Sequence, residues 1–154
     1  MRLTTRLAAL AVTTFAASLT AVPVALAADE PPPIEEDYAY PGADRIYAEK
    51  GIRLKRGDGR IVLVDCVNGA DQLEVWARNK PKFCFTVSGA PGWVTLELPQ
   101  VYLIKGESHN VDAVVQVAGK PTADTLRLKK SEWNPIGEGS STSDATLLEF
   151  RAVP

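Results

Sequence analysis

Two short segments of the chain each carry a tryptophan close to a glutamate. Glu74 and Trp76 share one side of LEVWAR, and Trp93 and Glu97 share one side of WVTLEL, because alternate residues of a strand point to the same face. An indole ring can stack on the apolar face of a sugar while a carboxylate accepts hydrogen bonds from its hydroxyl groups. These four residues are therefore candidate ligand-binding residues. The open alternative is that the indoles lie under a loop or an N-terminal helix.

Paired carboxylates also hydrolyse glycosides, one acid protonating the leaving oxygen while the other activates water or attacks the sugar. Glu74, Glu97 and Asp65 are the residues among which such a pair would be sought. A small carboxylate-dependent glycan hydrolase is therefore one alternative function.

The single histidine, His109, limits any catalysis that depends on imidazole. It lies in KGESHNVD beside Glu107 and Ser108, but adjacent loop residues rarely point at one another, and the sequence has no GxSxG turn. We predict a solvated loop here and no catalytic residue. Two cysteines and one histidine are a poor ligand set, so we expect neither a metal site nor a cofactor.

Short β-rich runs separated by turn signals must position these side chains. Asp58-Gly59 and Asn68-Gly69 are examples of the turns. Alternating apolar residues within the runs are typical of antiparallel strands that are buried on one face. We predict an all-β fold, an antiparallel β-sandwich of about eight to nine strands with jelly-roll or immunoglobulin-like connectivity. The runs are 52–55, 61–66, 72–78, 83–88, 93–98, 101–104, 111–118, 124–129 and 145–151.

Three further segments have distinct patterns. Residues 43–50 predict a short helix before the strands, with Asp44 as its cap and Gly51 at its end. The uninterrupted apolar run 61–64 predicts a strand in the middle of a sheet, covered on both sides. The longest stretch without a strand pattern is 130–144, where we expect a loop that Trp133 anchors.

The N-terminal residues 1–28 have the pattern of a secretory signal peptide: Arg2 and Arg6, an uncharged alanine-rich run and a small-residue site. A retained membrane anchor is the open alternative, although Pro23 interrupts the apolar run. Cleavage would leave an acidic, proline-rich disordered leader at 29–42 and one β-sandwich domain at 43–154. Loss of the two arginines changes the net charge from −2 to −4, too balanced to indicate nucleic acid or an anionic membrane as partner.

Export favours a disulfide between Cys66 and Cys84, the only cysteines. The loop that such a bridge closes is worth about 3 kcal/mol in the chain-entropy model. The braced segment 67–82 suggests a second alternative function, a secreted protease inhibitor or effector. We rank it behind simple binding because small inhibitors usually carry more than one disulfide.

Three strings resemble a group of small secreted proteins from actinobacteria, as does the alanine-rich signal peptide. They are EEDYAYPGADRIYAEKGIRLKRGDGRIVLVDC, FCFTVSGAPGWVTLELPQVYLIKG and GEGSSTSDATLLEF. The similarity covers nearly the whole chain after residue 28. It implies a secreted β-rich protein and transfers no activity, cofactor or binding residue.

We therefore expect a secreted, extracellular and non-catalytic domain that binds a cell-wall component, a polysaccharide or another protein. We expect no nucleic-acid partner and, after cleavage, no membrane contact. Convergence of Trp76, Trp93, Glu74 and Glu97 on one exposed face would favour a sugar as the ligand.

Overall fold

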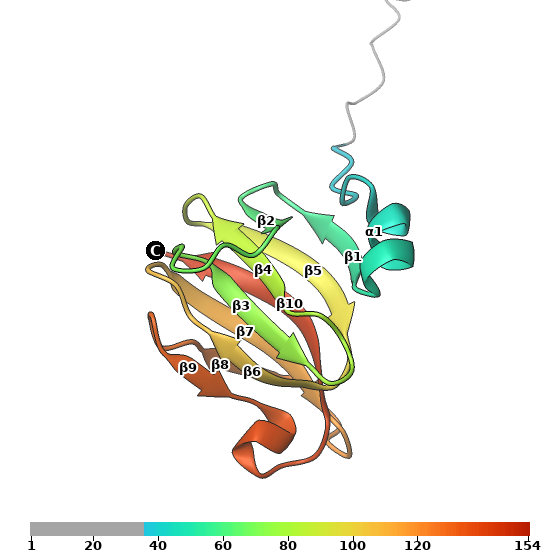
Figure 1. The fold of residues 1–154 in the computed structure, drawn as a ribbon, viewed down its shortest axis with the longest axis vertical. Coiled ribbons are helices and arrows are strands. Elements are labelled where there is room, and N and C mark those ends of the chain that lie inside the picture. Colours follow the sequence, from blue (N-terminus) through green and yellow to red (C-terminus); the bar gives the residue numbers. More distant parts are fainter. Residues whose placement is uncertain (1–35) are drawn as a thin grey trace, which may run out of the picture. The chain divides into compact units, whose positions relative to one another are not determined.

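The structure, a computed structural model, describes residues 36–154, in which ten strands form two antiparallel five-stranded sheets (Figure 1). Sheet A has the strand order β1-β5-β10-β7-β8, and sheet B has the order β2-β4-β3-β6-β9. The predicted all-β sandwich with one short helix before it is confirmed. The elements are α1 (Ala43–Lys50), β1 (Arg53–Gly57), β2 (Ile61–Val64), β3 (Leu73–Ala77), β4 (Phe83–Val87), β5 (Gly92–Leu98), β6 (Val101–Lys105), β7 (Asn110–Val117), β8 (Asp124–Arg127), β9 (Trp133–Pro135), the 3-10 helix η1 (Gly137–Ser140) and β10 (Ala145–Val153).

Alternating apolar residues of the two sheets build the core between them. On β5, the predicted inward residues Val94, Leu96 and Leu98 are buried, whereas the residues between them are more exposed. At the centre, Phe85 of sheet B meets Phe150 of sheet A edge to face, with ring centroids 5.4 Å apart. Such an aromatic contact adds about 0.5–1.5 kcal/mol to the stabilisation from burial. The outward-pointing residues of each strand are thereby held on a rigid support.

Helix α1 spans the predicted residues 43–50 and packs against β1. Gly42 occupies the N-cap, and the predicted cap Asp44 lies instead in the first turn, where a carboxylate favours the helix dipole. Gly51 ends the helix with φ of 71°, a left-handed conformation that glycine adopts without steric cost, and its N–H donates to the carbonyl of Tyr47. Ile46 packs against the core and ties the helix to the sandwich.

The strand β2 lies at the end of sheet B, so the prediction of a central strand at 61–64 is wrong. Val62 is 37% exposed. The backbone N–H of Leu63 donates to the hydroxyl of Tyr40 at 2.9 Å, and burial raises the pKa of Tyr40. An open strand edge invites pairing with another chain, and Tyr40 covers part of this one. An edge strand that is covered in this way can be as apolar as a central strand.

One strand, β9, is additional to the nine predicted runs and lies within 130–144, where the sequence predicts a loop. The buried side chain of Asn134 holds this segment in place: its Nδ2 donates to the carbonyls of Ile104, Lys129 and Glu132. Its Oδ1 accepts the backbone N–H of Lys129 at 2.9 Å. One amide side chain therefore satisfies several backbone N–H and carbonyl groups of an irregular segment. Residues 130–144 lie along the edge of sheet B, and we call them the strap.

Two glycines allow the strap to lie close to its neighbours. A Cβ atom on Gly106 would lie 2.1 Å from the carbonyl oxygen of Lys129, and a Cβ atom on Gly139 would lie 2.0 Å from that of Tyr102. Both contacts are far shorter than van der Waals distance and involve backbone atoms. A larger residue at either position would displace the strap.

The ordered domain begins before its predicted boundary at residue 43. Ala39 forms a β-bridge with Arg56 of β1, and the N–H of Tyr40 donates to the carbonyl of Lys55. The last part of the predicted leader therefore extends sheet A. The predicted signal peptide and the leader up to residue 35 lie outside the described residues. In residues 36–154, no helix is both long and apolar enough to cross a membrane.

Candidate functional site

The predicted disulfide between Cys66 and Cys84 is present, with Cα atoms 5.1 Å apart. Cys84 lies on β4, Cys66 follows β2, and these two strands are neighbours in sheet B. The bridge therefore joins adjacent strands. The segment 67–82 inside the ring contains β3, so only the turns on either side of that strand are available as the loop of an inhibitor.

The outer face of sheet B carries two exposed tryptophans that touch. Trp76 is 37% exposed and Trp133 is 46% exposed. Their ring centroids lie 6.1 Å apart, with the planes at 80°. The strand register places them diagonally across β6: Trp76 lies opposite Leu103 and Leu103 opposite Pro135, while Trp133, two residues before Pro135, lies opposite Lys105 in the neighbouring row. We call Trp76, Leu103, Trp133 and Pro135 the tryptophan face; an exposed apolar cluster of this kind is a candidate binding surface.

Glu74 points to the same side of sheet B as Trp76 and is largely enclosed there. Its carboxylate lies 3.3 Å from Nζ of Lys82 and 3.4 Å from Nζ of Lys105, and its side chain is 14% exposed. Nζ of Lys105 in turn lies 5.8 Å from the centroid of the Trp133 ring. Glu74 therefore holds two lysines at the border of the tryptophan face.

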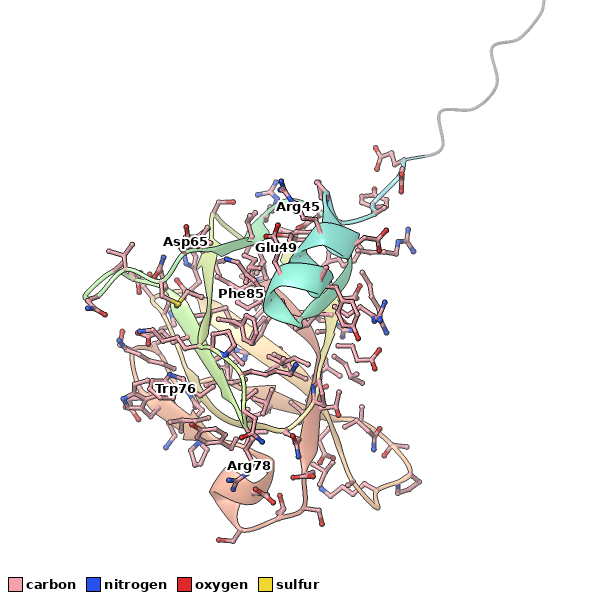
Figure 2. All side chains as sticks on the ribbon, turned by 45° about the vertical axis from the view of Figure 1, so that its right-hand side comes forward. Arg45, Glu49, Asp65, Trp76, Arg78 and Phe85 are labelled. Carbon is pink, nitrogen blue, oxygen red and sulfur yellow. A yellow bond between two sulfur atoms is a disulfide. The ribbon has the colours of Figure 1, made fainter. Side chains whose placement is uncertain are left out.

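A polar hollow of about 400 Å³ opens beside Trp76. Trp76 and Tyr102 line it together with Arg78, Lys80 and Lys82 from the turn between β3 and β4. Figure 2 shows Arg78 next to η1, where its guanidinium forms an ion pair with the carboxylate of Glu138. An aromatic wall and several cations thus border one concave surface.

The other two candidate residues lie on the opposite side of the sandwich. Trp93 is partly covered by Tyr38, with ring centroids 5.7 Å apart, and Glu97 pairs with Lys55 at 3.0 Å. Trp93 and Glu97 belong to the outer face of sheet A, whereas Trp76 and Glu74 belong to that of sheet B. The structure therefore does not bring the four residues together. Because the two carboxylates of a glycosidase flank one bond within about 10 Å, Glu74 and Glu97 cannot act as such a pair.

The loop after β6 is more ordered than a solvated tip. Glu107 is buried, and its carboxylate accepts the N–H of His109 at 2.8 Å and lies 2.7 Å from Nδ1 of the same residue. The hydroxyl of Ser108 donates to Asp71. The same hydroxyl lies 3.4 Å from the carboxylate of Glu107, so the serine and the imidazole both face carboxylates. The bond between Ser108 and Asp71 fastens two loops together, and the arrangement differs from a Ser-His relay, in which the hydroxyl donates to the imidazole.

No family model matches this chain, and a search of the curated proteins found no similar sequence. Within residues 36–154, no group of three or more His, Cys, Asp or Glu side chains is placed to hold a metal ion. The tryptophan face and the hollow beside it are therefore the candidate functional site.

The sequence reasoning missed Trp133 and the cations around Trp76. The sequence predicts that Trp133 anchors a loop, and its contact with Trp76 depends on the unpredicted strand β9. A signal for the cations does exist: RNKPK, residues 78–82, places three basic residues within five directly after Trp76 and Ala77. Aromatic residues and arginine are enriched at binding interfaces, and a group of cations concentrates anions near it, so this run next to Trp76 indicates a candidate binding surface.

Proposed function

We propose that this protein is a non-catalytic binding domain that acts outside the cell and holds a polysaccharide on the tryptophan face. The observation that carries the proposal is the exposed contact between Trp76 and Trp133, fixed by three neighbouring strands of sheet B. The disulfide supports an oxidising compartment, and the pattern of residues 1–28 supports export to one.

The exposed area of the two indoles is large enough for a sugar that covers it to bind with measurable affinity. A tryptophan side chain buries about 250 Å² when fully covered, so the exposed portions of Trp76 and Trp133 offer about 100 Å² each. At about 25 cal/mol per Å² this is about 2–3 kcal/mol for each ring, before the cost of ordering the ligand. Rigid aromatic rings lose little entropy on binding, which suits the repeated weak contacts of a polymer chain.

The experiment compares Trp76→Ala and Trp133→Ala with Trp93→Ala in retention on insoluble glycans. Trp93 is a matched control, because it is the same residue type on the outer face of sheet A. We expect the first two variants to lose at least tenfold in affinity and the control to bind as the unmodified protein does. Thermal melts establish that each variant is folded. Equal retention of all folded forms would contradict the proposal.

A further inference from the structure

The hollow beside Trp76 has a charge that the tryptophan face alone lacks. Arg78, Lys80 and Lys82 line it, and within the described part of the chain its lining contains no carboxylate. The whole chain has a formal net charge of −2, so this local excess of cations does not reflect a basic protein. A concave surface with cations concentrates anions near it.

The carboxylates near the hollow neutralise these cations only in part. Lys80 donates to the neutral carbonyl of Gly51 at 2.9 Å, which leaves two of its three N–H groups for other acceptors. Lys82 shares the single carboxylate of Glu74 with Lys105. One lysine therefore has a neutral partner, and two lysines share one negative charge.

Arg78 has a carboxylate partner that can be exchanged. It pairs with Glu138 of η1, and the two side chains are 54% and 40% exposed. Exposed ion pairs are worth about 0–1 kcal/mol because water screens them, so a ligand can compete with Glu138 for the guanidinium. A guanidinium also binds a planar carboxylate or a phosphate through two parallel hydrogen bonds.

We infer that this hollow binds the anionic substituent of an acidic glycan, a carboxylate or a phosphate, whose sugar ring lies on Trp76. The inference depends on the proposed function, because the indole that bears the sugar also forms a wall of the hollow. A volume of about 400 Å³ accommodates the charged group together with part of the ring that carries it. The preferred ligand is therefore an acidic polysaccharide and not a neutral one.

The experiment measures affinity for two backbones, cellulose and dextran, each as a carboxymethyl, a phosphate and a neutral soluble derivative. We expect at least fivefold tighter binding of an anionic derivative than of its neutral counterpart at low salt, and loss of that preference at high salt. The comparison of carboxymethyl with phosphate derivatives identifies the anionic group. Arg78→Gln with Lys80→Gln should reduce the preference to less than twofold, while Lys120→Gln, a substitution between β7 and β8 of sheet A, should leave it unchanged.

Lys80 also binds the carbonyl that ends α1, so Arg78→Gln alone serves as the second variant and should halve the preference or more. Equal binding of anionic and neutral derivatives by the unmodified protein would overturn the inference. So would an unchanged preference for anionic derivatives in both the double variant and Arg78→Gln. The proposed function would still stand if Trp76→Ala abolished that binding. Binding of none of the six derivatives by the unmodified protein would count against both.

Discussion

Opening the bridge between Cys66 and Cys84 should lower the free energy of unfolding by about 3 kcal/mol. The two cysteines are 18 residues apart, and closing a loop of this length removes about that much entropic free energy from the unfolded chain at 25 °C. For a domain of this size each kcal/mol moves the melting temperature by about 4 °C, which predicts a decrease of about 12 °C. Cys84 is 1% exposed, and a free thiol in its place packs as a small apolar group, so little further loss is expected.

Thermal unfolding by far-UV circular dichroism can test this value in two independent ways. The unmodified protein with dithiothreitol and the Cys66→Ala, Cys84→Ala variant without it should melt at similar temperatures, because both lack the same restriction on the unfolded chain. Dithiothreitol should not change the melting of the variant. A decrease below about 4 °C in both cases would refute the entropic reasoning. It would show that the unfolded chain already keeps these two positions close together.

Three further substitutions test the strap, the edge of β2 and the charge network. Gly139→Ala places a methyl group against a backbone carbonyl of β6 and should cost about 1–3 kcal/mol in urea unfolding, whereas Gly119→Ala, in open space with φ of 85°, should cost about 1 kcal/mol. Tyr40→Phe removes the partner of the Leu63 N–H and should cost about 1–3 kcal/mol. Burial raises the pKa of Tyr40, so its contribution to the free energy of unfolding is complete below the ordinary phenol pKa of about 10 and is lost as the pH rises through the higher folded value. Chemical denaturation between pH 8 and 11 should show this loss of stability in the unmodified protein and not in Tyr40→Phe. Glu74→Gln frees two lysines and should strengthen binding of an anionic glycan by about twofold to fivefold, measured by titration calorimetry, with no change for a neutral one.

Local sequence rules predict the strands well because strands such as β3, β5 and β7 alternate buried and more exposed residues. Every predicted β-rich run overlaps a strand, and the inward residues of β5 are those that the alternation indicates. The strap is different, because it depends on contacts between distant parts of the chain. The strand β9 has three residues and exists because Asn134 is buried and because Gly106 and Gly139 permit close approach. The β-propensities of the individual residues do not reflect such contacts.

The binding residues show the same division between local and distant information. Trp76 and Trp93 are equivalent in sequence, each on the outer face of an alternating strand and each near a glutamate. The order of strands decides their different surroundings: Trp76 gains Trp133 across β6, whereas Trp93 is covered by Tyr38 from the N-terminal segment. Strand order follows from the packing of the whole sandwich, so the sequence identified the candidates but could not choose between them.

The tryptophan face requires the strap to lie against sheet B, whereas no residue of the strap lines the hollow. β3 supplies Trp76, and the strap supplies its partner Trp133. A substitution that loosens the strap without touching the ligand, such as Gly139→Ala, should therefore weaken binding of a neutral glycan together with stability. Because Trp76 remains in place on β3, the residual binding should equal that of Trp133→Ala, the variant that removes only the indole of the strap.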